Sequence, residues 1–164
     1  MNQKSKEVFK VYPIGYVRNT GERFYIELDK KFIPAMKQLD QFSHLQMLCW
    51  FHEHDNKKGR QMLKDIPPYK GAPETGVFAS RSPARPNPIA LGAVVMVHVD
   101  TKNGVIDLAY TDAHDGTPII DLKPYMPICD RAREVRMPEW LAHWPEWIPE
   151  GDFDPEEYGF IIEE

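Results

Sequence analysis

The stretch IALGAVVMVHVDTKNGVIDLAY, residues 89–110, decides the fold of this 164-residue chain. Apolar residues recur at every second position from Ile89 to Val99, which is the period of a β-strand and places them on one face. Asn103-Gly104 separates this run from a second strand-like run, VIDLAY. Asn-Gly between two such runs is a strong hairpin signal, because both residues tolerate positive φ. The sequence therefore predicts a long β-hairpin here.

Other short runs with the same two-residue period lie earlier in the chain. FYIEL, residues 24–28, and HLQMLCWF, residues 44–51, alternate apolar and polar side chains in the manner of half-buried strands. A further strand is expected over residues 11–17, where Pro13 favours an edge position. These runs predict a sheet of several short antiparallel strands.

Helical signals are few. Pro34 suits the first turn of a short helix that carries Ile33, Met36 and Leu39. MPEWLAHWPEW, residues 137–147, spaces its aromatic residues as a helix does, and we expect such a helix to cap an open end of the sheet. The predicted fold class is mainly β: a small closed or nearly closed antiparallel β-barrel with a few short helices. Residues 1–164 are expected to form one domain, of which 131–164 are a tryptophan-rich and acidic tail.

Bulk composition limits the function classes. The net charge of −5 excludes a strongly basic protein that coats nucleic acid, but it leaves room for a local basic patch. Two widely spaced cysteines, Cys49 and Cys129, make neither a disulfide scaffold nor a zinc site. The N-terminal residues have no apolar run of signal-peptide length, and no run is long enough to span a bilayer. We expect a cytoplasmic protein with no membrane partner.

Three prolines stiffen the segment SRSPARPNPIAL, residues 80–91, because proline fixes φ and restricts the residue before it. A stiff loop can meet a ligand without first becoming ordered. The arginine fork suits a carboxylate or a phosphate, and asparagine can pair with an adenine edge. The alternative is that the arginines neutralise acids in a structural corner. The candidate ligand-binding residues of this loop are Arg81, Arg85 and Asn87.

Two more segments end in polar turns. DAHDGTPIIDLKPYMP, residues 112–127, holds Asp115 and Asp121, which suit ribose hydroxyls or an ammonium group and alternatively pair with Arg81, Arg85 or Lys123. FSHLQMLCWFHEHD, residues 42–55, holds His44, His52 and His54. No HExxH pattern is present, so no metal site is expected, and a histidine at a strand end is typical of a hydrogen-bonding group or general base. Since each segment is a strand that runs into a turn, all three turns are expected to meet at one rim.

The residues 53–75 form a long polar segment, and loops of that length are often functional. It carries Lys57, Lys58 and Arg60 in a basic cluster that suits RNA, with a plain solvated loop as the equal alternative. The candidate substrate-binding residues are Lys57, Lys58, Arg60, Lys123 and Tyr125.

Four stretches together resemble one known family: IGYVRN, QFSHL, GVFASRSPARPNPI and HDGTPIIDLKPYMP. They are similar to the TsaA-like, or TrmO, family of S-adenosylmethionine-dependent tRNA methyltransferases, over roughly residues 12–130. The resemblance implies a small β-barrel that works as a homodimer, with S-adenosylmethionine near the subunit boundary. It also implies methylation of the exocyclic nitrogen of threonylcarbamoyladenosine beside the tRNA anticodon. The chain departs from the bacterial pattern in its short connection after the first strand and in its tryptophan-rich tail in place of an extra domain.

The resemblance implies a cofactor shell made of His52, Glu53, Arg81, Leu91, Asp115, Gly116, Thr117 and Pro118. Arg85 and Asn87 match the same loop and are added to the expected cofactor-binding residues. Methyl transfer to a nitrogen also requires that a proton leave, so the expected catalytic residues are His52, as proton acceptor, and Asp115 as second candidate.

Three alternatives stay open at this point. The first is a methyltransferase that acts on another RNA or on a small molecule. The second is a non-catalytic module that binds S-adenosylmethionine or a nucleotide. The third is a metal-dependent hydrolase that uses the three histidines at positions 44, 52 and 54.

Overall fold

The structure, a computed structural model, describes residues 7–147 and 159–160. The chain divides into two compact units, each built from two stretches of sequence. The first unit comprises Met1–Glu53 and Ile89–Cys129, and the second comprises His54–Pro88 and Asp130–Glu164. Each unit is described below by itself.

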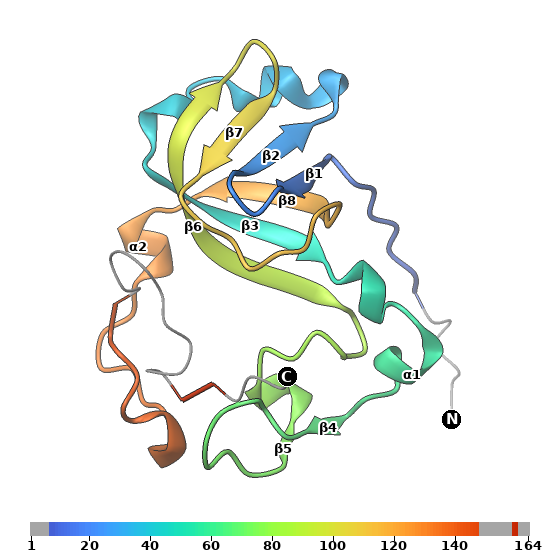
Figure 1. Cartoon of the computed structure of the whole chain (residues 1–164), viewed down its shortest axis with the longest axis vertical. Helices are drawn as coiled ribbons and strands as arrows, with labels where there is room; N and C mark the ends of the chain where they lie inside the picture. The colour runs from blue at the N-terminus through green and yellow to red at the C-terminus, as the bar shows by residue number, and fades with distance from the viewer. Residues whose placement is uncertain (1–6, 148–158, 161–164) are drawn as a thin grey trace. The chain divides into compact units, whose positions relative to one another are not determined.

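The first unit is a closed antiparallel barrel with the strand order β1-β2-β7-β6-β3-β8 (Figure 1). This confirms the predicted fold class. Closure gives every strand a partner on both sides, so the barrel presents no open edge. The strands are β1 (Gly15–Asn19), β2 (Phe24–Leu28), β3 (His44–Trp50), β6 (Ile89–Asp100), β7 (Val105–Leu108) and β8 (Pro118–Pro124).

The predicted hairpin is present as β6 and β7, joined by residues 101–104. Its turn differs from the predicted one, because only Gly104, at φ +78°, has a positive φ. The Asp100 carboxylate fixes the turn by accepting hydrogen bonds from the Asn103 side chain at 2.6 Å and from the backbone N–H groups of Lys102 and Asn103 at 3.0 Å. The Gly104 N–H closes the turn on the Asp100 carbonyl at 2.9 Å. These bonds favour a four-residue turn over the tight two-residue form.

The odd-numbered apolar residues from Ile89 to Val97 do share one face of β6, and that face points outward. Their even-numbered neighbours Val94 and Met96 fill the barrel instead. The pairing register of β6 with β7 shifts between Met96 and His98, and Val99 beyond the shift packs against the core. The buried barrel core consists of Val17, Ile26, Leu28, Met36, Leu45, Met47, Cys49, Val94, Met96, Ile106, Leu108 and Ile119.

The first strand differs from its prediction. It begins at Gly15, not within residues 11–14, and it pairs with both β2 and β8, so the expectation of an edge strand is wrong. Pro13 lies outside the strand, where its missing N–H costs no ladder bond. A Cβ at Gly15 would lie 2.4 Å from the Glu27 carbonyl oxygen, so the close approach of β1 and β2 requires glycine here.

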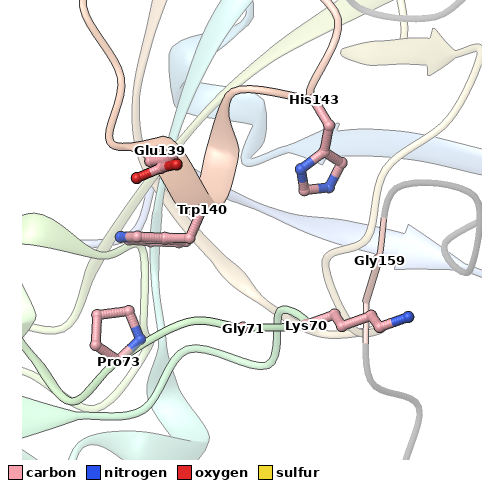
Figure 2. A pocket seen from close by; sticks show the side chains of 7 residues that line it. All are labelled: Lys70, Gly71, Pro73, Glu139, Trp140, His143 and Gly159. Carbon is pink, nitrogen blue, oxygen red and sulfur yellow. The ribbon is translucent and has the colours of Figure 1, made fainter.

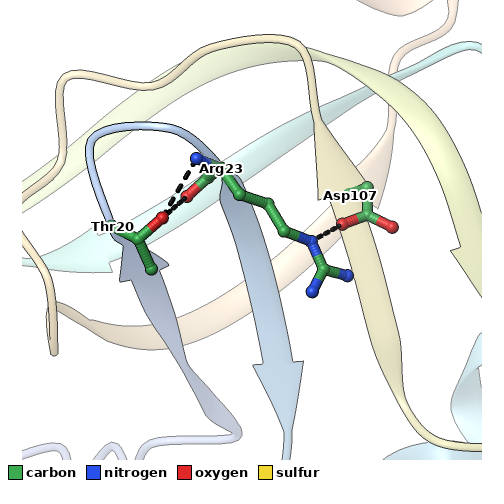
Figure 3. Close-up of polar contacts among 3 residues, drawn as sticks. All are labelled: Thr20, Arg23 and Asp107. Carbon is green, nitrogen blue, oxygen red and sulfur yellow. Dashed lines mark hydrogen bonds and ion pairs between the residues drawn. The ribbon is translucent and has the colours of Figure 1, made fainter.

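The connection from β1 to β2 is a short turn over residues 20–23, as the sequence predicts (Figure 3). Thr20 Oγ1 accepts a hydrogen bond from the Arg23 N–H at 3.1 Å and donates to the Arg23 carbonyl at 3.3 Å. Arg23 Nε reaches across to Asp107 Oδ1 on β7 at 2.7 Å. The turn is therefore tied to the next strand of the barrel.

The helical elements are short throughout. The predicted helix around Pro34 is a 3-10 helix, with Pro34 in its second half. The predicted helix over 137–147 is wrong except for one 3-10 turn, because Pro138 and Pro145 confine any helix to the six residues between them. The short helices are α1 (Lys57–Arg60), α2 (Pro127–Asp130), η1 (Lys30–Met36), η2 (Leu39–Gln41), η3 (His52–His54), η4 (Val77–Ala79) and η5 (Glu139–Leu141).

The second unit contains a two-stranded sheet, β4 (Lys64–Asp65) with β5 (Thr75–Gly76), inside the segment expected to be a polar loop. Asn56 caps α1 by accepting a hydrogen bond from the Gly59 N–H at 2.9 Å. Most of the acidic tail, and residues 1–6, lie outside the described residues. Among the helices that the structure does describe, none has the length and hydropathy needed to cross a bilayer.

Candidate functional site

Strand register brings several predicted site segments to one end of the barrel. Trp50, at the end of β3, pairs with Ile89, at the start of β6. Cys49 pairs with Ile119, near the start of β8. The residues that follow β3 and those that precede β8 therefore leave the barrel at the same rim, as predicted, and β6 begins there.

The segment after β3 contributes a carboxylate and a histidine to this rim. His52 is exposed on the 3-10 turn η3. Its neighbour Glu53 pairs through Oε2 with Nδ1 of His114 at 2.8 Å, across 61 positions of sequence. Sequence reasoning did not select His114, although it directly precedes the Asp115-Gly116 turn. The contact joins two of the three predicted turns.

The turn before β8 is fixed to β1 by hydrogen bonds. Asp115 Oδ1 accepts from the Asn19 N–H at 3.0 Å. Gly116, at φ +76°, donates its N–H to the Val17 carbonyl at 2.8 Å, and its positive φ suits glycine at this position. The buried Thr117 accepts from the Val17 N–H at 2.9 Å. Asp115 is thus an exposed carboxylate on a rigid backbone.

The outer face of the barrel adds apolar surface close to this rim. Leu91 on β6 is 49% exposed and pairs with Leu48 on β3, which pairs in turn with Asp121 on β8. The Asp121 carboxylate pairs with Lys123 Nζ at 2.7 Å, which bears out the pairing alternative for this residue. The three strands therefore present leucines beside an ion pair on one outer face.

The proline loop belongs to the second unit and is held by its own arginine. Arg85 Nε donates to the Ser82 carbonyl at 2.8 Å, and Nη2 donates to the Val77 and Ser80 carbonyls, both at 2.7 Å. Arg81 and Asn87 are exposed, whereas Pro88 is buried. The Arg85 guanidinium thus shapes the loop from within, and Arg81 is the exposed guanidinium of this loop.

The five candidate substrate-binding residues divide between the two units. Lys57 and Lys58 are exposed on α1 in the second unit, where Arg60 pairs with Asp55 and also donates to the Pro86 carbonyl at 3.3 Å. Lys123 and Tyr125 belong to the barrel unit, at the end of β8 far from Thr117. Seven strand residues at about 3.3 Å each separate the two ends of β8 by roughly 20 Å.

The two cysteines of the chain differ in burial. Burial raises the pKa of the Cys49 thiol to about 12, so this inward-facing residue is a core group and a poor nucleophile. Cys129 is exposed. Within residues 7–147 and 159–160, no three histidine, cysteine, aspartate or glutamate side chains are grouped so as to hold a metal ion. The groups that this rim offers for chemistry are carboxylates and imidazoles.

Known proteins are similar to this chain in sequence, and solved structures are similar to it in fold. A "Probable S-adenosyl-L-methionine-binding protein" of Pyrococcus horikoshii is 39% identical over 120 residues, which cover 71% of this chain and 82% of that protein. A tRNA (adenine(37)-N6)-methyltransferase of Escherichia coli is 33% identical over 120 residues, covering 71% of this chain and 50% of that enzyme. A crystal structure of TrmO from Pseudomonas aeruginosa superposes with a TM-score of 0.61 at 28% identity, over 79% of this chain and 62% of that one.

The chain therefore spans about half the length of the E. coli enzyme and under two thirds of the solved structure. The profile of the tRNA-methyltransferase O N-terminal domain matches residues 6–131, which is most of the chain. The resemblance seen in the four sequence motifs is thereby confirmed, and the chain belongs to the tRNA-methyltransferase O N-terminal domain family.

Proposed function

We propose that the chain is an S-adenosylmethionine-dependent tRNA methyltransferase that acts on the exocyclic nitrogen of threonylcarbamoyladenosine. The observation that carries the proposal is the joining of the β3 and β8 turns at one barrel rim through Glu53 and His114. The names of the relatives support the cofactor and the substrate class.

The rim residues fit the cofactor by their chemistry. Leu91 offers apolar surface to a purine, and the carboxylates of Glu53 and Asp115 suit ribose hydroxyls and a positively charged sulfonium. The remaining proposed cofactor contacts in the barrel unit are His52, Gly116, Thr117 and Pro118. From the second unit, Arg81 is the proposed partner of the amino-acid carboxylate, with Asn87 beside it and Arg85 as the residue that holds the loop in shape.

The proposed methyl transfer depends more on how the protein positions the two reactants than on chemical activation by its side chains. When bound, S-adenosylmethionine supplies a methyl group already activated by its sulfonium. The protein holds the acceptor nitrogen in line with it, which accounts for a large share of such rate enhancements. The acceptor nitrogen must also lose a proton, and the exposed imidazole of His52 is the proposed proton acceptor, with Asp115 as the second candidate.

The proposal includes a homodimer. Four apolar side chains on the outer face of β6 are exposed to 38%, 49%, 39% and 67%; they are Ile89, Leu91, Val95 and Val97. An apolar stripe of this kind on a strand favours a partner surface. Replacing Val97 with lysine should shift the protein to monomer in sedimentation analysis, and an unchanged sedimentation coefficient would reject this face as the interface.

The experiment that tests the activity is calorimetry with S-adenosylmethionine, followed by a methylation assay. Arg81→Ala should weaken cofactor binding by about tenfold or more, the loss expected for a charge-assisted hydrogen bond, whereas Arg133→Ala should match the wild type. The assay compares tRNA that contains threonylcarbamoyladenosine with unmodified tRNA, bulk RNA and metabolite pools. Equal binding by Arg81→Ala and the wild type would refute the site assignment.

Some relatives are named for binding alone, so a non-catalytic binding module is the second candidate. It predicts cofactor binding with no methyl transfer to any of the tested pools.

An enzyme that acts on tRNA works where tRNA is, so the proposal includes a cytoplasmic location, which cell fractionation would check. Lys57, Lys58 and Arg60, with Lys123 and Tyr125, stay the proposed RNA contacts.

A further inference from the structure

A pocket of about 760 Å³ lies in the second unit (Figure 2). Its volume lies within the range of small-molecule sites and fits a nucleotide. Its walls come from three parts of the sequence: the β4–β5 connection, the segment that carries η5, and Gly159. The lining residues are Lys70, Gly71, Pro73, Glu139, Trp140, His143 and Gly159.

The flat wall of the pocket is Trp140, whose ring is held by an aromatic cluster. Trp140 stacks on Tyr69, with an interplanar angle of 18° and ring centroids 6.1 Å apart. Trp144 and Phe160 meet the Tyr69 ring edge-on at 4.8 and 5.0 Å, and they stack on each other at 5.5 Å. A backbone hydrogen bond from the Lys70 N–H to the Gly159 carbonyl at 2.7 Å joins two of the segments that line the pocket. The indole is therefore a preset surface that needs little ordering to accept a second ring.

The polar groups around that surface differ in charge. Lys70 presents an exposed ammonium, Glu139 an exposed carboxylate and His143 an exposed imidazole. Figure 2 shows the His143 ring pointing into the space between Trp140 and Gly159. A carboxylate in the wall disfavours a bare anion such as free phosphate. It favours a ligand that has amino hydrogens at one end and a negative group at the other, as a nucleotide has.

We propose that this pocket binds one unpaired nucleotide of the RNA substrate. The base stacks on Trp140, an amino group of the base donates to Glu139, and the phosphate lies near Lys70. Stacking on an aromatic side chain is the usual way in which proteins hold an unpaired base. The inference rests on the proposed function, because it takes RNA as the substrate, and it assigns part of the RNA recognition to the second unit.

The neighbouring sequence supports RNA as the source of the nucleotide. The segment before Pro138 carries three exposed arginines within six residues: Arg131, Arg133 and Arg136. Arginines close to an aromatic side chain on which a base can stack, here Trp140, are typical of surfaces that follow a single-stranded backbone. A free nucleotide would use the pocket but not the arginines.

The test is fluorescence anisotropy with a fluorescein-labelled anticodon stem-loop RNA, with the full chain. Trp140→Leu should weaken binding roughly 5- to 100-fold, the range for loss of one base stack. The matched control is Phe9→Leu, because Phe9 is exposed, belongs to the first unit and lines neither the pocket nor the arginine segment. It should stay within about twofold of the wild type.

A second variant leaves the aromatic cluster intact. Lys70→Glu should weaken RNA binding and lower the slope of log affinity against log salt by about one unit, whereas Lys30→Glu, on the barrel, should leave the slope unchanged. Unchanged RNA binding in both pocket variants, or an equal loss in Trp140→Leu and Phe9→Leu, would overturn the proposal. Calorimetry with S-adenosylmethionine on the same variants should give wild-type affinity. If the wild type itself did not bind S-adenosylmethionine, that result would instead count against the proposed function.

Discussion

The two units of the chain are stabilised in different ways. The barrel is held by six paired strands around a core whose central residues, such as Ile26 and Ile106, are fully buried. The part of the second unit that the structure describes has one sheet of two very short strands, and single side chains such as Arg85 and Tyr69 hold its segments. A repeated pattern of burial thus specifies the first unit, and individual contacts specify the second.

The largest expected effect is in the barrel core. Ile106 is fully buried and pairs with Ile26 on β2 and Val99 on β6. Ile106→Ala should lower the free energy of unfolding by about 2–5 kcal/mol, because it removes buried methyl groups and leaves a cavity. Chemical denaturation measures this, with the exposed Lys30→Ala as control. A loss below about 0.5 kcal/mol would mean that the barrel does not depend on its core in the way described.

A smaller and more local effect is expected from Arg85. Arg85→Met removes three hydrogen bonds to the carbonyls of Val77, Ser80 and Ser82. Bonds of this type contribute about 1.5–3 kcal/mol each at most, so we expect a loss of about 2 kcal/mol. Hydrogen exchange should speed up over residues 77–82 while β3 and β6 keep their protection. Arg85→Lys should behave like Arg85→Met, since lysine keeps the charge but lacks the fork; full protection in either variant would refute the role.

The smallest effect is expected from Asp100. Like Arg85, it makes several hydrogen bonds within one loop, but its turn is already held by the pairing of β6 with β7. Hydrogen bonds from the Asn103 side chain and backbone lower the pKa of the Asp100 carboxyl. The folded state therefore favours the carboxylate, and its contribution is present at neutral pH and fades as the pH falls below about 4. Asp100→Asn should be slightly less stable than the wild type at pH 7. A gap that widens on acidification would contradict the assigned cause.

Much of the barrel could be predicted from the sequence, because alternation of apolar residues has a direct structural meaning. The strands around Ile26, Met47 and Val94 follow from that period. The position of the turn before β7 follows from Asn103-Gly104, whereas its four-residue form does not. The start of β1 at Gly15 could not be predicted. Glycine is required there because the Glu27 carbonyl of the neighbouring strand lies very close, and the sequence does not show that approach. Pairing on both sides of a strand is a property of the closed sheet and is not written in the strand itself.

The candidate site was less predictable. Turn residues such as His52 and Asp115 follow from their places at strand ends, and the register places both at one rim. The partner of Glu53 did not follow, because His114 lies 61 positions away and only barrel closure brings it near. The pocket beside Trp140 did not follow either, since tryptophans at helical spacing predicted a helix, and prolines at 138 and 145 prevented it.

The register shift between Met96 and His98 lets one strand serve two surfaces. Before the shift, every second side chain of β6 looks away from the interior, and after it Val99 looks inward. The outward-facing residues of β6 can therefore change without any repacking inside the barrel. A deletion of Val97, the extra residue at the shift, would leave the pairs Met96–Leu108 and His98–Asp107 intact, whereas a deletion elsewhere in β6 would exchange the inner and outer faces on one side of it.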